Sequence, residues 1–143
     1  FPYTTLFRSG EKLYPLSLVA SGGEISRVML ALSTTISNNY NVDTVVFDEI
    51  DTGTSGKTGE KIGKKLKNLS EKRQIISISH LAQIASNADN HIKIYKESEK
   101  GRNITKAKAL NDKERIEEIA KIISGEKITE HAIKHAEELL NNN

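Results

Sequence analysis

An aspartate and a glutamate stand side by side after a short apolar segment, where they could act on a phosphate. Asp48 and Glu49 follow residues 44–47, whose β-branched and aromatic side chains predict a buried strand. An aspartate at a strand end can hold Mg²⁺, mostly through water, while the metal bridges nucleotide phosphates. A neighbouring glutamate can reach the water that attacks the terminal phosphate. An acidic pair can also simply end a strand at the surface, and the pattern alone favours that plainer interpretation.

A second candidate site lies at Ser21, Gly22, Gly23 and Glu24. A Ser-Gly-Gly turn at a helix start exposes backbone N–H groups, and the positive end of the helix dipole favours a bound phosphate. Glycines have no Cβ atom to block a close approach, and the serine hydroxyl adds a donor. Serine followed three residues later by glutamate is also a capping box, which alone is the more common explanation.

A histidine completes the set of candidate residues. His80 follows the isoleucine-rich residues 74–79, which predict a second buried strand. At the carboxyl end of a strand next to the acidic pair, an imidazole could hydrogen-bond a terminal phosphate or the attacking water. Most single histidines have no such function, so this residue carries weight only together with the others.

The elements that must position these residues alternate between strands and helices. Such alternation predicts an α/β class with a mostly parallel sheet flanked by helices, whose ligands lie beyond the carboxyl ends of the strands. The apolar stripe of the first helix is formed by Ile25, Val28, Met29, Leu32 and Ile36. Strands are predicted at residues 44–47, 74–79, 91–96 and 103–109, and helices at 21–38, 58–69, 81–87, 111–124 and 129–140.

Composition excludes some classes of protein without indicating a function. The 143 residues carry a net charge of only +2 and include no cysteine, so disulfides and thiolate metal sites are impossible. No apolar run approaches the roughly 20 residues that span a bilayer, and no secretory signal is recognisable, so no membrane partner is expected. The small net charge falls short of a strongly basic nucleic-acid-binding domain.

The order of the motifs resembles that of ABC ATPases of the SMC-like type. Residues 20–24 look like the ABC signature motif, residues 45–49 like the Walker B strand, residues 50–53 like the D-loop, and His80 like the switch histidine. The resemblance covers about residues 13–143 and implies the C-terminal portion of an ABC/SMC-like P-loop NTPase head, an incomplete domain. Residues 1–12 are unassigned and look non-native.

The resemblance implies a role for each motif in an ATPase that acts in DNA double-strand break repair and recombination. Asp48 would hold Mg²⁺ through water, Glu49 would be the general base and His80 would sense the phosphate. Asp51 of the D-loop would act across a homodimer whose two heads sandwich ATP. The signature residues Ser21, Gly22, Gly23 and Glu24 would contact the ATP held by the other subunit. DNA would be a partner through the full-length protein, in the cytoplasm and associated with the nucleoid.

The phosphate-binding Walker A loop of the family, G-x-x-x-x-G-K-[ST], is absent from this sequence as such. Residues 51–58, Asp-Thr-Gly-Thr-Ser-Gly-Lys-Thr, imitate it with Asp51 in place of the first glycine. A carboxylate at the mouth of the loop would repel phosphates, so assignment of Asp51 to the D-loop is favoured. We therefore expect the isolated chain to bind ATP weakly or not at all and not to hydrolyse it.

The sequence is also compatible with two other functions. A nucleotide-binding subunit of an ABC transporter shares the order of motifs, although the D-loop sequence and Glu24 look more SMC-like. A non-catalytic DNA-binding module would use a helix face that carries five lysines, although lysines on a solvated face are the plainer explanation. The pair His131 and His135 has metal-ligand spacing but no third ligand nearby in sequence, which favours a solvated face.

Overall fold

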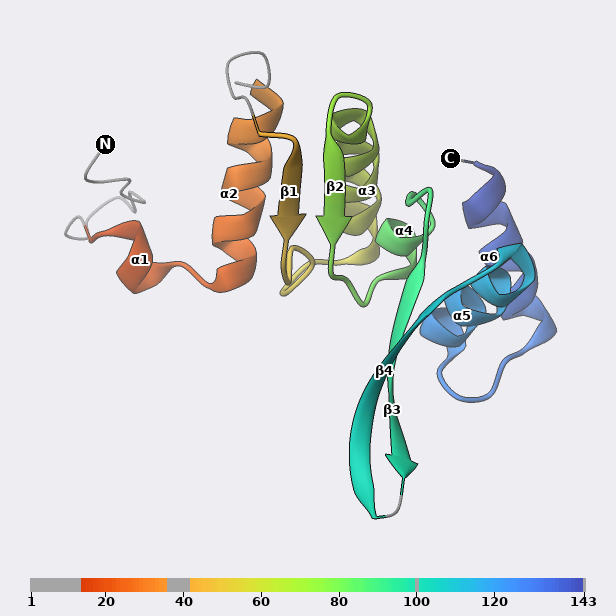
Figure 1. Cartoon of the computed structure of the whole chain (residues 1–143). Helices are drawn as coiled ribbons and strands as arrows, with labels where there is room; N and C mark the ends of the chain where they lie inside the picture. Colours follow the sequence, from red (N-terminus) through yellow and green to blue (C-terminus); the bar gives the residue numbers. More distant parts are fainter. Residues whose placement is uncertain (1–13, 36–41, 100, 143) are drawn as a thin grey trace.

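The computed structural model describes residues 14–35, 42–99 and 101–142, and Figure 1 shows how their elements are arranged. None of the described helices is long and apolar enough to cross a membrane. Residues 1–12, predicted to be non-native, lie outside the described residues. The elements in chain order are α1 (Leu16–Val19), α2 (Gly22–Thr35), β1 (Thr44–Phe47), α3 (Gly56–Ser70), β2 (Gln74–Ser77), α4 (Ala82–Ala85), β3 (Ile92–Glu99), β4 (Arg102–Ala109), α5 (Asp112–Ser124) and α6 (Glu130–Asn141).

The strands β1 and β2 form a parallel pair, as their apolar sequences predict. Their register runs from Thr44 opposite Gln74 to Phe47 opposite Ser77. The amide of Ile78 continues the pairing by donating to the carbonyl of Phe47 at 2.9 Å. The connection between the strands contains α3, which is the usual way to join two parallel strands. Both strands therefore run in the same direction and end at the same edge.

The first core lies where α2 and α3 pack around β1 and its following loop. Phe47 and Ile50 are buried together with Leu30, and the inward face of α3 supplies Ile62, Leu66 and Leu69, as predicted. Ile50 is completely buried although it belongs to a loop. Burial of a large apolar side chain contributes about 1.5–3 kcal/mol to the free energy of unfolding. Burial of Ile50 therefore holds the loop that follows the acidic pair in place.

The apolar stripe predicted on α2 is only partly confirmed. Ile25, Met29 and Leu32 are 37%, 51% and 46% exposed, whereas the buried apolar side chain of this helix is that of Leu30, which the stripe did not include. The fifth stripe residue, Ile36, lies outside the described residues. The reason is geometric, since α2 contacts the first core along one side and the rest of its apolar surface meets no described segment. Val46, Ile76 and Ile78 leave a similar exposed surface on the β1–β2 pair.

The second core joins α4, α5 and α6. Its buried residues are mostly small, with Ile119 as the largest and Ala120 and Ala136 fully covered. The predicted capping box of α5 is present, since Asn111 accepts from the amide of Glu114 and the Glu114 side chain accepts from the amide of Asn111. Gly125 ends α5 with φ 76°, a conformation that favours glycine.

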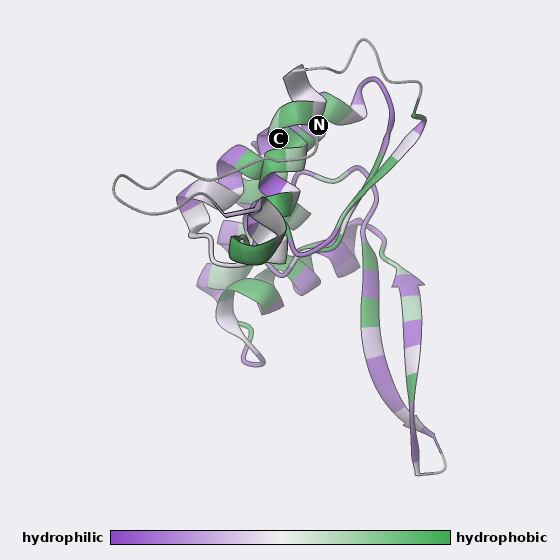
Figure 2. Cartoon of the chain, turned by 90° about the vertical axis from the view of Figure 1, so that its left-hand side faces the viewer, coloured by the Kyte–Doolittle hydropathy of each residue, from purple (hydrophilic) through white to green (hydrophobic). Residues whose placement is uncertain are grey.

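The strands β3 and β4 form an antiparallel hairpin that projects away from the helices (Figure 1). They do not join the β1–β2 pair, so the described residues contain one parallel and one antiparallel pair. Hydrophobic and hydrophilic residues alternate along the hairpin in Figure 2, and Ile92 and Ile94 on one face are more than half exposed. Lys93 pairs with Glu118 and Lys108 with Glu114, which ties the base of the hairpin to α5.

Candidate functional site

The parallel pairing brings the predicted chemical residues to one edge. Asp48 and Glu49 leave the end of β1, and His80 follows the end of β2 three residues after Ser77. The prediction that these two strands deliver the carboxylates and the imidazole to the same rim is confirmed. All three side chains are exposed, and the imidazole of His80 is 73% exposed.

The backbone at Glu49 has an unusual conformation. Its φ of 52° lies in the left-handed region, and Glu49 is the only described non-glycine residue with positive φ. Such a conformation costs a residue with a Cβ atom about 1–2 kcal/mol, so the surrounding structure must hold it in place. The carbonyl of Glu49 accepts from the amide of Thr52 at 3.1 Å, which closes a tight turn directly after the acidic pair.

The start of α2 lies against this turn. Gly23 is buried, and a Cβ atom added there would lie 2.9 Å from the carbonyl oxygen of Glu49 and 3.0 Å from Thr52. A Cβ atom on Gly22 would lie 3.8 Å from Oε2 of Glu49. Gly23 is therefore needed for the close approach of α2 to backbone of the same chain, whereas Gly22 has room for a Cβ atom. Close approach of a phosphate to these glycines stays a prediction.

Ser21 and Glu24 form the capping box that was the plainer explanation of their spacing. The Glu24 carboxylate accepts from the amide of Ser21 at 2.8 Å and from its hydroxyl at 3.0 Å. The amide of Glu24 donates to the Ser21 hydroxyl at 3.4 Å. Gly22 and Gly23 are the first residues of α2, where amides have no acceptor within a helix. Contact between these residues and a partner's ATP stays a prediction.

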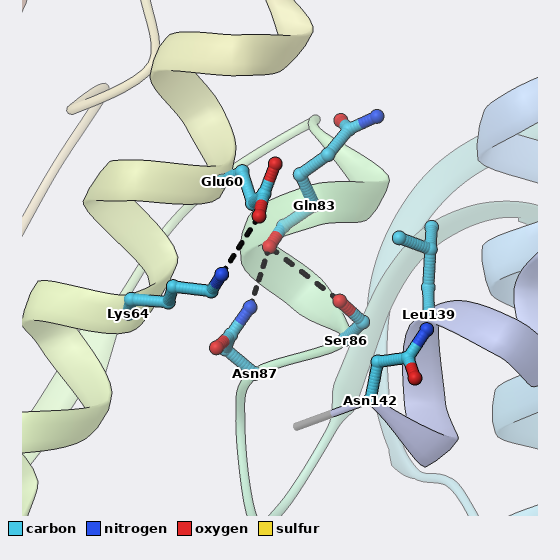
Figure 3. Close-up of a pocket in the computed structure, with 7 residues that line it drawn as sticks. All are labelled: Glu60, Lys64, Gln83, Ser86, Asn87, Leu139 and Asn142. Carbon is cyan, nitrogen blue, oxygen red and sulfur yellow. Dashed lines mark hydrogen bonds and ion pairs between the residues drawn. The ribbon is translucent and has the colours of Figure 1, made fainter.

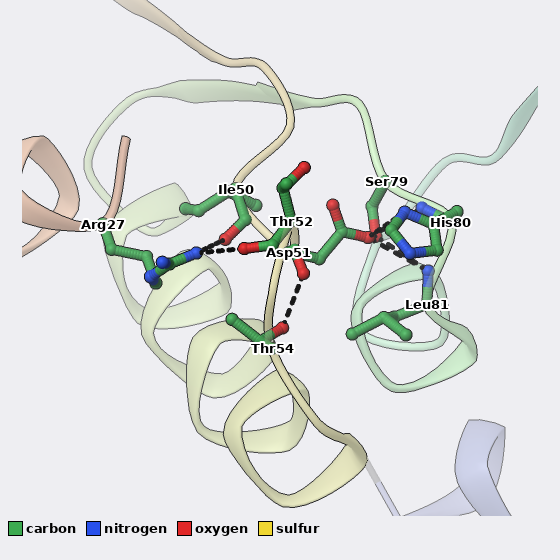
Figure 4. A network of polar contacts seen from close by, with 8 residues as sticks. All are labelled: Arg27, Ile50, Asp51, Thr52, Thr54, Ser79, His80 and Leu81. Atoms are coloured by element: carbon green, nitrogen blue, oxygen red, sulfur yellow. Dashed lines mark hydrogen bonds and ion pairs between the residues drawn. The ribbon is translucent and has the colours of Figure 1, made fainter. Parts of the chain in front are cut away.

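Two side chains of α2 hold the loop that follows β1, and no sequence pattern indicated a specific role for either. The Ser26 hydroxyl donates to the carbonyl of Asp48 at 2.8 Å. The guanidinium of Arg27 donates to the carbonyls of Ile50 at 3.1 Å and Thr52 at 2.8 Å (Figure 4). Their position one turn inside a glycine-started helix was visible in the sequence, but the backbone acceptors were not. The helix α2 and the loop after β1 are thus joined within one subunit.

We expect Arg27→Ala to lower the stability of a full-length protein that carries this sequence by about 1–3 kcal/mol, because two carbonyls lose their donor. Arg27→Lys retains the charge but cannot span both carbonyls, so its loss should be intermediate. Thermal unfolding of the two variants beside the wild type measures the effect. Equal melting temperatures for all three proteins would show that these bonds contribute nothing.

Asp51 lies at the centre of a second network, between the loops that follow β1 and β2. Its side chain is 1% exposed, and Oδ2 accepts from the Ser79 hydroxyl at 2.6 Å, from the His80 amide at 2.8 Å and from the Leu81 amide at 3.2 Å. Nδ1 of His80 lies 3.1 Å from the same oxygen. Figure 4 shows the carboxylate directed at the His80 loop and away from Arg27.

These contacts keep Asp51 ionised. Burial raises the pKa of Asp51, but the hydrogen bonds from Ser79 and from the His80 backbone, with the nearby imidazole, outweigh it and hold the pKa below its usual value. A buried, ionised carboxylate turned toward His80 cannot form the mouth of a phosphate-binding loop. The geometry thus agrees with assignment to the D-loop, although action of Asp51 across a dimer stays a prediction.

The residues at this edge could bind Mg²⁺ only together with nucleotide phosphates, which would supply further ligands. Among the described residues, no group of three or more acidic, histidine or cysteine side chains could hold a metal ion. Asp48 provides a single exposed carboxylate beside the site of Glu49. One carboxylate with water and phosphate ligands is the usual coordination of Mg²⁺ in nucleotide sites, so Asp48 would be its protein ligand.

The other candidate residues lie apart from this edge. On the lysine face of α3, Lys64 pairs with Glu60 and Lys67 with Asp89. His131 and His135 are exposed on α6, as the plainer explanation requires. A separate hollow between α3, α4 and α6 is shown in Figure 3, lined by Glu60, Lys64, Gln83, Ser86, Asn87, Leu139 and Asn142. Its polar groups largely bond one another, and none of the chemical residues lines it.

Comparison with curated proteins agrees with this arrangement of motifs. Over 131 residues the chain is 50% identical to the DNA repair protein RecN of Halalkalibacterium halodurans, a match that covers 92% of the chain. It is 44% identical to RecN of Bacillus subtilis and 47% identical to RecN of Deinococcus radiodurans, again over 92% of the chain. The chain is therefore similar to one part of RecN. It spans about a quarter of these RecN proteins, 23% of the length of each.

Solved structures show the fold of this chain. An SMC ATPase structure from work on ATP-driven dimerization and DNA-stimulated activation matches with a TM-score of 0.56 at 20% identity, covering 86% of this chain and 73% of that one. The Smc head domain of Pyrococcus furiosus, bound to the C-terminal domain of ScpA, matches with a TM-score of 0.53 at 22% identity, covering 84% and 29%. No family model matches the chain. The fold class is thus a partial α/β P-loop NTPase of the SMC type.

Proposed function

We propose that this chain is the C-terminal part of the ATP-binding and hydrolysing head of a RecN-type protein in DNA double-strand break repair and recombination. The supporting observation is that β1 and β2 end at the same edge, so that Asp48, Glu49 and His80 follow the ends of neighbouring strands. The start of α2 packs against the turn that follows β1. Similarity to RecN over 92% of the chain supports the biological process. The comparisons give no support to a transporter subunit.

Each residue of the edge has a role that its position allows. Glu49 is the general base, because its exposed carboxylate follows β1 and can accept a proton from a water at the rim. His80 contacts the terminal phosphate from the neighbouring loop. Asp48 holds Mg²⁺, which when bound neutralises charge that develops on the phosphates. Ser21, Gly22, Gly23 and Glu24 form a helix start that favours an anion, here the ATP of a second subunit.

The homodimer rests on the resemblance to ABC-type ATPases, in which the signature helix of one subunit contacts the nucleotide held by another copy. ATP joins two heads, hydrolysis separates them, and Asp51 lies in the loop that faces the junction. The same function places the full-length protein with DNA, in the cytoplasm and at the nucleoid.

ATP turnover by the full-length protein tests the proposal. We expect Mg²⁺-dependent hydrolysis by the full-length protein, whereas this 143-residue chain, without a Walker A loop, should bind ATP weakly and hydrolyse none. Isothermal titration of the chain and a phosphate-release assay of the full-length protein measure both. Micromolar affinity of the chain for ATP would contradict the division of the site, and an inactive full-length protein would contradict the function.

A further inference from the structure

The roles proposed above do not explain what fixes the orientation of the exposed His80 ring. Nothing buries this imidazole, since 73% of its side chain is exposed. An exposed side chain of this type ordinarily samples several rotamers, which would be a poor arrangement for a group that must meet one phosphate oxygen. The one polar group that the structure places against the ring is the Asp51 carboxylate, with Oδ2 at 3.1 Å from Nδ1.

The carboxylate is itself held firmly. Asp51 is fully buried, and its Oδ2 also receives the Ser79 hydroxyl and the amides of His80 and Leu81. The same oxygen thus accepts from the backbone amide of His80 and lies 3.1 Å from Nδ1 of its ring, so the loop and the ring are held against one buried carboxylate. The other oxygen, Oδ1, is buried with no hydrogen-bond partner among the described residues. The low pKa keeps the group an acceptor at neutral pH.

We propose that Asp51 is a positioning residue for His80 within its own subunit. Its carboxylate accepts the Nδ1–H of the ring, which fixes the orientation of the ring and leaves Nε2 exposed at the rim. When both ring nitrogens carry protons, Nε2–H donates to a phosphate oxygen, and when only Nδ1 does, Nε2 accepts a hydrogen bond from water. A carboxylate that orients a functional histidine in this way is a recurring device in enzymes. Because Asp51 follows β1 and His80 follows β2, the contact also links the acidic loop to the histidine loop. The inference rests on the proposed ATPase function.

A double-mutant cycle in a full-length protein carrying this sequence tests the inference. Asp51→Asn should lower kcat for ATP hydrolysis by about tenfold or more, with a much smaller change in KM, as loss of a histidine's partner usually does. In the His80→Ala background the same change should have almost no further effect, because the two residues act as a unit. Losses that multiply would show that Asp51 acts independently of His80 and would overturn the proposal.

Two further variants separate positioning from folding. Asp89→Asn makes the same chemical change at an exposed carboxylate and should leave kcat unchanged. Ser79→Ala removes a donor to Asp51 but keeps the contact with the ring, so it should lower the melting temperature while reducing kcat far less than Asp51→Asn. If Ser79→Ala and Asp51→Asn reduce kcat equally at equal loss of stability, the network is only structural and the proposal fails.

A readout independent of turnover separates this inference from the proposed function. In ¹⁵N-histidine-labelled protein, the neutral form of His80 should carry its proton on Nδ1, and Asp51→Asn should shift that proton toward Nε2. Wild-type His80 protonated at Nε2 would overturn the inference even in an active ATPase. An inactive protein with the Nδ1–H form would overturn the proposed function and leave the contact intact.

Discussion

Replacement of Glu49 by glutamine in a full-length protein that carries this sequence is expected to reduce kcat for ATP hydrolysis by about 10²-fold or more, since general-base catalysis contributes about 10²–10⁴-fold. Glutamine has nearly the same shape but cannot accept the proton of the attacking water. ATP binding should persist, because the other groups at the edge remain. The variant should therefore accumulate as an ATP-bound dimer, which size-exclusion chromatography with and without ATP would reveal.

A matched control is available on α3, where the exposed Glu71 follows the last residue of the helix and lies outside the edge. Glu71→Gln should leave turnover and dimerisation unchanged. Turnover of Glu49→Gln equal to that of Glu71→Gln would show that Glu49 is not the base. The two variants carry the same chemical change, so a difference between them reports position alone.

Gly23→Ala is the second variant from which we expect a large effect. Its new methyl group would lie 2.9 Å from the Glu49 carbonyl oxygen and 3.0 Å from both Cβ and the carbonyl oxygen of Thr52. Real Cβ atoms rarely approach backbone so closely, so α2 or the turn after β1 must move. Overpacking of this kind costs about 1–3 kcal/mol, and the movement would displace Glu49 itself. We expect a lower melting temperature together with a large loss of kcat.

The neighbouring glycine provides the comparison. A Cβ atom on Gly22 would lie 3.8 Å from the end of the flexible Glu49 side chain, which is ordinary contact. Gly22→Ala should therefore leave the melting temperature close to that of the wild type. Circular dichroism melts of both variants in the full-length protein measure the difference. Equal destabilisation by the two alanines would contradict the packing of α2 on the Glu49 turn.

The helices and strands, and the approach of Asp48, Glu49 and His80 to one edge, could be predicted because both depend on residues close together in the sequence. The β-branched segments gave β1 and β2 within two residues, and parallel strands carry whatever follows them to one edge. The Asn111 and Glu114 spacing identified the start of α5, since capping depends on residues three apart. The same local logic explains Ser21 and Glu24.

The networks that hold the edge could not be predicted, because their partners are distant in sequence and many are backbone atoms. Arg27 bonds carbonyls more than 20 residues away, and no side-chain pattern marks a carbonyl as an acceptor. Asp51 was assigned to a loop facing a second subunit, but its buried contact with Ser79 and His80 depends on how two loops pack. The exposed stripe of α2 shows that periodicity identifies an apolar face without indicating what covers it.

Under the proposed function, the left-handed backbone at Glu49 makes this position a compromise between folding and catalysis. Glycine would adopt φ 52° with little strain and would relieve the chain, but it would remove the acid that the turn displays. A carboxylate there is retained against the local conformational preference, so the free energy that keeps it in place must come from the burial of Ile50 and the bonds of Ser26 and Arg27 around it. Loss of these surrounding contacts would allow the Glu49 carboxylate to move while the rest of the domain stays folded.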